Sequence, residues 1–370
     1  MRCIKCDHDS KYKERQSGTC PKCGERFAFE PQRKDAFTDR AFLNAIQRVS
    51  SEGHVRWTVR NLYCEACRLK RWRFNWKGTV GAATIAAVLW AVGIWGNFPT
   101  GVVWAAIITV TVSVYAVVEF LKLRFPQHTV PLTYTQFRDL FERWRRAHGI
   151  PKGFIEAREQ ESPSRVPPPD IVEYSFDRVV ICDEPHTVDL LLANNFHFEN
   201  NCAVLTANGY PPGPFETVRT MLKRNPRLQV FALHDARPYG CRMAHQVAND
   251  PDWFQGQAPV VDVGLRPGHA RPFTGLLLPN PHGHILPGAG VTVQEAVWLS
   301  QYTLELAAIR PEQVLKRLYR AVNKKSDAST TGGDGGDGAY LHTGSGYVEE
   351  DMDSFSSEAG AMDGGDDSFG

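Results

Sequence analysis

Residues 178–184 read RVVICDE, and residues 228–240 read LQVFALHDARPYG. Each stretch starts with an apolar run of the length of a buried strand and then changes to charged residues. A third such run covers residues 203–206, and segments with helical spacing of apolar residues separate the three runs. Strands that alternate with helices predict a parallel sheet, so we expect an α/β domain over residues 171–325.

Acidic side chains follow two of these strands. Asp183 and Glu184 come directly after the first strand, and Asp235 comes after the third. The carboxyl ends of parallel strands meet at one edge of a sheet, where α/β proteins bind ligands. Carboxylate oxygens are the ligands that Mg²⁺ prefers, and a bound ion would polarise a phosphoryl oxygen. The three acids are therefore candidate Mg²⁺ ligands; the alternative is that they only cap the following helices.

Four cysteines near the N-terminus have the spacing of a zinc site. They form two C-x-x-C pairs, Cys3 with Cys6 and Cys20 with Cys23. Four thiolates can surround zinc as a tetrahedron, and a full set leaves no open position for catalysis. We expect a structural zinc ribbon over residues 1–26, with a redox-active pair as the alternative.

The segment between the ribbon and the sheet is expected to contain helices. Residues 34–53 have helical spacing of apolar side chains and residues 54–63 alternate like a strand, so residues 27–77 are compatible with part of a winged helix. Residues 135–148 predict an amphipathic helix. Residues 159–170 are rich in proline and charge, and we interpret them as a linker, so that residues 120–170 contain an amphipathic helix and a linker.

Two uncharged apolar runs interrupt this segment. They cover residues 79–95 and 101–118, and a short turn joins them. Runs of this length fit the short end of a bilayer span, and basic residues flank the pair on both sides. We therefore expect a two-helix transmembrane hairpin over residues 78–119, with both termini cytoplasmic. A buried hairpin of a soluble domain is the alternative.

Charge is distributed unevenly along the chain. The 370 residues carry a formal net charge of +1, but residues 326–370 contain eleven acidic and no basic residues. The 42 basic residues then face 30 acidic ones in residues 1–325, a net charge of +12. A basic body suits a polyanionic partner, and the acidic tail, which we expect to be disordered, can compete for the same surface. The alternative is an ordinary solvated surface with a solubilising tail.

The strand ends and residues 58–63 together resemble a known family. One strand ends at Glu184, a second precedes Asn208-Gly-Tyr-Pro, and a third precedes Asp235-x-x-Pro-Tyr-Gly. This series is similar to the Toprim domain of the type VI DNA topoisomerase A subunit and of its meiotic double-strand-break relative. Residues 58–63, TVRNLY, resemble the motif of the family's winged-helix domain that carries a nucleophilic tyrosine. The resemblance covers residues 34–73 and 125–323.

The resemblance implies a function and a set of residues. It implies a type IIB topoisomerase-like enzyme that cleaves double-stranded DNA with Mg²⁺, works as a homodimer and has an ATPase partner like the topoisomerase VI B subunit. It assigns metal binding to Glu184 and Asp235, with Asp183 one residue out of register. It assigns covalent attack on DNA to Tyr63 or Cys64.

Two positions depart from the family's pattern. Arg237 stands where the third-strand motif has its second acid, and a cation there would repel Mg²⁺. Cys64 stands at the second aromatic position, which carries the nucleophile in the family, while Tyr63 occupies the first. Both departures predict that cleavage is lost.

These observations leave three functional hypotheses. The first is a membrane-anchored, DNA-binding pseudoenzyme. The second is an active Mg²⁺-dependent enzyme that attacks DNA with Tyr63 and holds the metal with Glu184 and Asp235. The third is a membrane adaptor that binds protein partners only.

Overall fold

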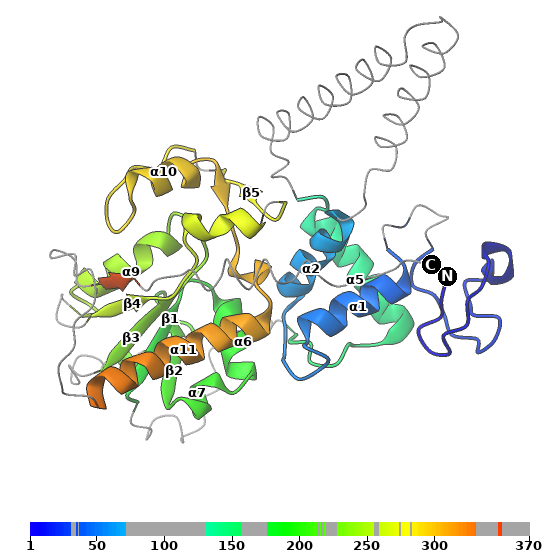
Figure 1. The fold of residues 1–370 in the computed structure, drawn as a ribbon, viewed down its shortest axis with the longest axis horizontal. Helices are drawn as coiled ribbons and strands as arrows, with labels where there is room; N and C mark the ends of the chain where they lie inside the picture. Colours follow the sequence, from blue (N-terminus) through cyan, green and yellow to red (C-terminus); the bar gives the residue numbers. More distant parts are fainter. Residues whose placement is uncertain are drawn as a thin grey trace, which may run out of the picture.

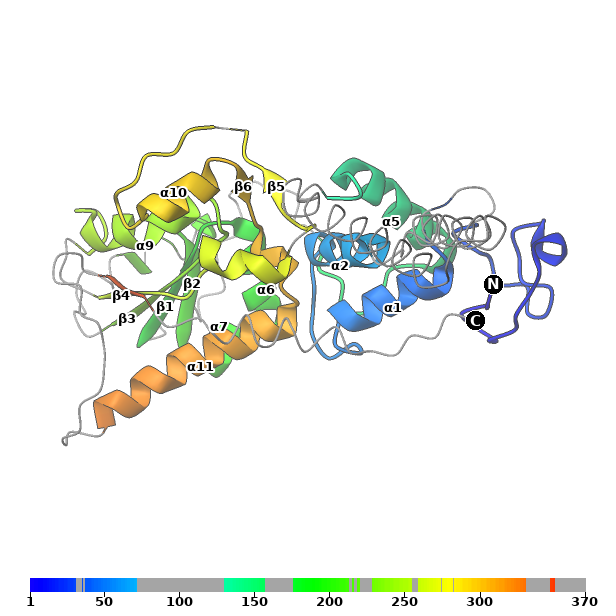
Figure 2. The ribbon, with the colours of Figure 1, turned by 45° about the horizontal axis from the view of Figure 1, so that its top comes forward.

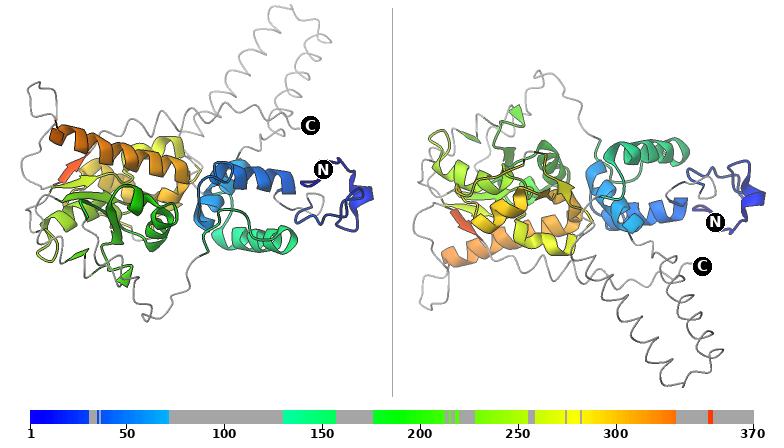
Figure 3. Two further views of the ribbon diagram at one scale, coloured as in Figure 1. Left: turned by 90° about the horizontal axis from the view of Figure 1, so that it is seen from below. Right: turned by 90° about the horizontal axis from the view of Figure 1, so that it is seen from above.

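The computed structural model describes residues 1–30, 35, 37–71, 130–156, 176–212, 215, 218–219, 228–254, 259–273, 275–281, 283–330 and 347–349. Three parts follow one another in space (Figure 1). They are the cysteine ribbon (residues 1–26), a helical region (residues 37–71 and 130–156) and a sheet region (residues 176–330). Seen from below and from above, the helical region lies between the cysteine ribbon and the sheet region (Figure 3).

Parallel strands form the centre of the sheet region, as the sequence predicts. They are β1 Arg178–Cys182, β2 Cys202–Thr206, β3 Gln229–Leu233 and β4 Val260–Asp262. The four strands pair in the order β2-β1-β3-β4, and every pairing is parallel. The mixed α/β fold with a parallel sheet is therefore confirmed.

Side chains alternate between two covered faces of this sheet. Val180 and Cys182 of β1 pack into the larger apolar core, which continues into the helical region. Val179 and Ile181, the alternate residues of the same strand, pack into a second core on the opposite face. This period of two explains why the strands appear in the sequence as continuous apolar runs: both faces are buried.

Helices cover both faces, as Figure 2 shows. On the face of the larger core lie α6 (Pro185–Ala193), α7 (Phe196–Glu199) and α11 (Pro311–Thr330). On the face of the second core lies α9 (Gly240–Asn249). The remaining short elements are η4 Pro267–Phe273, β5 Leu278–Pro279, α10 Val293–Leu299, β6 Tyr302–Thr303 and η5 Leu306–Ala308.

The order of the strands brings the acidic residues together at the carboxyl edge of the sheet. β1 lies between β2 and β3, and the helices that follow β1 and β3 cover opposite faces. Such a reversal opens a crevice at the carboxyl ends of the two strands. Asp183 and Glu184 follow β1 and Asp235 follows β3, so the fold brings all three to this crevice.

The helical region packs around an aromatic core. Its helices are α1 (Asp39–Val49), α2 (Val59–Arg71) and α5 (Tyr134–His148). The buried aromatic side chains are Phe29, Phe37, Phe42, Trp57, Tyr63, Phe137, Phe141 and Trp144. The amphipathic helix predicted over residues 135–148 is confirmed, because its apolar side faces this core.

The strand predicted over residues 54–63 is wrong, because the second half of that segment is the start of α2. Thr58 donates its backbone N–H and its hydroxyl to Asn61 Oδ1 at 3.0 and 2.7 Å, an arrangement typical of a helix N-terminus. Extended backbone remains only near Trp57, which forms an isolated bridge with Phe154. The described part of residues 27–77 therefore contains helices but no strand. The strand that a winged helix would need is not found there.

The two-span membrane prediction also requires correction. In the part of the chain that the structure describes, no helix combines the length and the apolar character needed to cross a bilayer. The predicted hairpin over residues 78–119 lies outside the described residues. A membrane protein with two spans and cytoplasmic termini is therefore not supported.

The predicted disordered tail contributes one strand to the sheet. α11 continues to Thr330, and β7 (Tyr347–Glu349) pairs in parallel with β4 (Figure 1). The other residues predicted as tail, 331–346 and 350–370, lie outside the described residues.

A close backbone approach beyond β4 requires glycine. A Cβ atom on Gly264 would lie 2.5 Å from Cγ and Nε2 of His234, whose ring is completely buried. Neither ring nor strand can move without disturbing the packed core. Gly264 thus lets the chain after β4 pass directly over the His234 ring.

We predict that Gly264→Ala lowers the free energy of unfolding by about 2 kcal/mol, the typical cost of overpacking a core. Gly268→Ala is the matched control, because nothing lies within 4 Å of its added Cβ. Urea denaturation of both variants measures the difference. Equal stability of the two variants would contradict the steric argument.

Candidate functional site

The two aspartates at the strand ends lie against each other in the crevice. Asp235 donates its backbone N–H to Asp183 Oδ2 at 2.8 Å. Asp235 Oδ1 in turn accepts a hydrogen bond from the backbone N–H of Leu306 at 2.7 Å. Asp235 is completely buried and Asp183 is 7% exposed. The fold therefore brings together two of the three acids that the sequence predicts there.

Arg237 reaches into this crevice and contacts three carboxylates. Its guanidinium donates to Glu184 Oε1 at 2.8 Å and to Glu305 Oε1 at 2.7 Å. Its Nε lies 3.2 Å from Asp235 Oδ2. Glu184, the third predicted acid, is therefore linked to Asp235 through the Arg237 guanidinium, which both carboxylates contact. We call Asp183, Glu184, Asp235, Arg237 and Glu305 the acid–arginine cluster.

Glu305 is a member that the sequence analysis missed. It lies just before η5 and is 68 residues away from Arg237 in the chain. Its Oε1 also accepts a hydrogen bond from Arg60 of α2 at 2.7 Å. No local pattern marks this residue, because only the tertiary fold brings η5 between the sheet and α2.

Burial controls the protonation of the two aspartates. It raises the pKa of Asp183 to about 6, although His234 and Arg237 act in the opposite direction. It also raises the pKa of Asp235 well above its ordinary value, and the charge of Asp183 adds to this effect. Asp183 Oδ1 has no hydrogen-bond partner within the described residues, and Asp235 Oδ2 has only the ionic contact with Arg237 Nε. Burial therefore disfavours the charged form of both aspartates at this edge of the sheet.

The residues present do not fit the predicted Mg²⁺ site. Within the described ranges, the only group of three or more His, Cys, Asp or Glu side chains with ligand spacing is formed by four N-terminal cysteines. At the crevice, the Arg237 guanidinium takes up the acceptor oxygens of Glu184 and Glu305 that a cation would need. Its positive charge also opposes entry of a second cation.

Tyr63 and Cys64 lie in the interior rather than at a surface. Tyr63 is 5% exposed, and its hydroxyl donates to the backbone carbonyl of Leu132 at 2.8 Å. Burial raises the pKa of both side chains well above their ordinary values. A protonated, buried hydroxyl or thiol is a weak nucleophile. Both residues lie on α2, where they contribute to the aromatic core.

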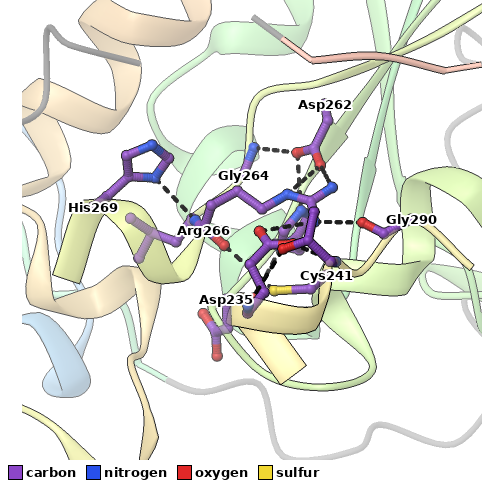
Figure 4. Close-up of polar contacts among 11 residues, drawn as sticks. Asp235, Cys241, Asp262, Gly264, Arg266, His269 and Gly290 are labelled. Carbon is purple, nitrogen blue, oxygen red and sulfur yellow. Dashed lines mark hydrogen bonds and ion pairs between the residues drawn. The ribbon is translucent and has the colours of Figure 1, made fainter. Parts of the chain in front are cut away.

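A second buried network surrounds Asp262 at the end of β4. The sequence analysis missed most of its members. Asp262 accepts hydrogen bonds from His234 Nε2 at 2.9 Å and from Gly264 N at 3.0 Å. Its other oxygen accepts from Arg266 Nη2 at 2.6 Å, and Arg266 also donates to the carbonyl of Gly290 at 2.9 Å (Figure 4). All side-chain groups are satisfied, so this network is structural.

Both ring nitrogens of His234 face hydrogen-bond acceptors. Its Nδ1 lies 2.8 Å from the carbonyl oxygen of Asp235, and its Nε2 lies 2.9 Å from the carboxylate of Asp262. Both partners accept only, so both nitrogens must donate. Burial favours the neutral ring, but the charge of Asp262 outweighs it and raises the pKa of His234. The surroundings of His234 thus favour the positively charged ring next to the acid–arginine cluster.

The four N-terminal cysteines form a compact group at the opposite end of the molecule. Their ligand atoms all lie within 4.8 Å of one another. The Sγ atoms of Cys3 and Cys23 are 3.6 Å apart, and those of Cys6 and Cys20 are 3.7 Å apart. Zinc–sulfur bonds of about 2.3 Å in a tetrahedron place the sulfurs about 3.8 Å apart. The group can hold a metal ion such as zinc.

Comparisons with known proteins do not identify a family. Neither the models of protein families, nor the curated proteins, nor the solved structures give a match. The resemblance to topoisomerase VI therefore stays a prediction that depends on the motifs alone.

We predict that the purified chain binds one equivalent of zinc and that Cys20→Ser abolishes this binding, because three thiolates hold the ion more weakly than four. Cys67→Ala is the control, since Cys67 is buried in the helical region and far from the group in sequence. Elemental analysis after exhaustive dialysis gives the result. Zinc retained by Cys20→Ser would argue against the site.

We predict that Arg237→Met lowers the free energy of unfolding by about 3 kcal/mol at pH 8, because it leaves Glu184, Asp235 and Glu305 without their shared cation. The loss should shrink below pH 6. Groups with raised pKa values, such as Asp183, become protonated as the pH falls and then need no cation. Thermal denaturation at pH 5 and pH 8 measures both effects.

Arg219→Met is the matched control, because Arg219 pairs with Asp252, which is 73% exposed. A surface pair of this kind contributes about 1 kcal/mol at most. A pH-independent loss for Arg237→Met, or a loss no larger than that of the control, would contradict the proposed charge balance.

Proposed function

We propose that this chain is a DNA-binding protein of the topoisomerase VI A type that has lost strand cleavage. The observation that carries the proposal is the position of Arg237. Its guanidinium contacts Glu184, Asp235 and Glu305 at the carboxyl edge of the parallel sheet. In a Toprim-like enzyme this edge would hold Mg²⁺, and the chain supplies a side-chain cation there instead.

The surroundings of the predicted nucleophiles support the same conclusion. Tyr63 donates its hydroxyl to Leu132 within the core, and Cys64 is 6% exposed. An attacking group must reach the phosphorus atom of its substrate, and catalytic groups have pKa values near the working pH. Burial works against both requirements at these two positions.

The charge of the chain supports DNA as the partner. Residues 1–325 carry a net charge of +12, which favours binding to phosphates by release of counterions. The homodimer and the ATPase partner that the resemblance implies are further predictions. A protein-binding adaptor is the competing function, and it requires no affinity for DNA.

We predict that the full chain binds supercoiled plasmid in the presence of Mg²⁺, and that binding weakens steeply between about 50 and 200 mM salt. After denaturation, the plasmid should be intact and free of protein, because Arg237 occupies the place of the metal ion at the sheet edge and both Tyr63 and Cys64 are buried. Gel electrophoresis before and after denaturation gives both results.

Tyr63→Phe is the control for covalent attack. Nicked or linear plasmid attached to the wild-type chain, and absent with Tyr63→Phe, would establish an active enzyme and disprove the loss of cleavage. No binding even at low salt would disprove the DNA-binding function and favour the adaptor.

A further inference from the structure

The positive charge of the chain is concentrated in its N-terminal half. Residues 1–71 and 130–156 contain 21 basic and 12 acidic residues, a net charge of +9. Residues 176–325 of the sheet region contain 15 basic and 13 acidic residues, a net charge of +2. The part of the molecule made of the cysteine ribbon and the helical region therefore attracts a polyanion much more strongly than the sheet region does.

The acidic residues of the cysteine ribbon are already engaged. Asp9 accepts a hydrogen bond from the amino group of Met1 at 2.8 Å, and Asp7 pairs with Arg40 at 3.3 Å. Glu14 accepts a hydrogen bond from the backbone N–H of Lys11 at 3.0 Å. Their charges are thus partly compensated within the protein.

Three lysines of the cysteine ribbon are exposed and uncompensated. Lys11 directly precedes η1 (Tyr12–Arg15), Lys13 lies within it, and Lys22 lies inside the second C-x-x-C pair. None of the three forms an ion pair with any described residue, and all three are exposed. Their ammonium groups are therefore available to phosphates.

The cysteine ribbon is fixed to the helical region, so these lysines have a defined position. Buried Arg15 pairs with Glu30 at 2.7 Å. Asp39 of α1 accepts the backbone N–H groups of Ala28 and Phe29 at 2.9 Å each. His148, at the end of α5, lies 2.8 Å from the same carboxylate and 3.5 Å from the carboxylate of Glu25 in the ribbon. The end of α5, with its exposed Arg146, thus adjoins the ribbon (Figure 3).

The carboxyl edge of the sheet is a poor competitor for DNA. Arg60 and Arg237, which point toward that edge, already contact Glu305 and Glu184. The carboxyl groups of Asp183 and Asp235 lie beside them. Phosphates approaching this edge would meet carboxylates whose arginines are occupied.

We propose that the cysteine ribbon, with Lys11, Lys13 and Lys22 and the adjoining end of α5, is the surface that binds the phosphate backbone of duplex DNA. The inference depends on the proposed DNA-binding function and names the face that performs it. Contacts of this kind position the duplex without reading its sequence.

The test uses the full zinc-loaded chain with Lys11, Lys13 and Lys22 all changed to Gln. The matched control changes Arg219, Lys316 and Arg320 of the sheet region to Gln, which removes the same charge. Fluorescence anisotropy with a labelled duplex of random sequence, at several salt concentrations, gives the affinity and its salt dependence. Zinc content and thermal denaturation verify that both variants are folded.

We expect the ribbon variant to bind about tenfold more weakly at low salt, with a salt-dependence slope reduced by about 2 to 3, and the control variant to bind like the wild type. If wild type binds and the ribbon variant binds equally well, or if both variants weaken alike, the assignment of the surface is wrong and DNA binding stands. If wild type does not bind, the proposed function fails together with the surface.

Discussion

The guanidinium of Arg237 is the interaction on which the centre of this molecule depends. Parallel strands β1 and β3 both end in acids, and the crossing of their helices to opposite faces brings those acids into one crevice. Isolated carboxylates in such a place are costly, because burial disfavours the charged form. A planar cation with several donors can contact several carboxylates at once, and Arg237 does so with Glu184, Asp235 and Glu305.

The same contact joins the two regions of the chain. Glu305 lies between Arg237 of the sheet region and Arg60 of the helical region. Nearby, Arg310 contacts Glu65 of α2 at 2.9 Å. In this second ion pair across the boundary, the arginine belongs to the sheet region and the acid to the helical region. The larger apolar core also continues across it. The helical region is therefore held to the sheet by apolar packing, with ion pairs that fix how α2 is oriented.

The sequence predicts the parts of this arrangement that depend on neighbouring residues. Strands β1 and β3 follow from apolar runs, the crevice acids from their place after those runs, and the cysteine group from C-x-x-C spacing. The strand predicted over residues 54–63 was wrong because a short alternation around Trp57 resembles the start of a strand, whereas the helix signal begins at Thr58. Glu305 and Arg60 could not be predicted, because 245 residues separate this contacting pair. Asp262 and Arg266 lie four residues apart, but nothing in their spacing indicates that both are buried.

The sharing of Glu305 has an evolutionary consequence. Glu305 accepts both Arg60 and Arg237, so its negative charge matches two cations on two different elements. An acid at position 237 would add a negative charge and remove a positive one, while leaving Glu305 and Glu184 in place around it. Such a variant would be less stable than the present chain, because the surrounding carboxylates would lose their shared cation. Selection for stability alone therefore opposes replacement of Arg237 by an acid, unless a compensating change occurs at a distant position such as Glu305.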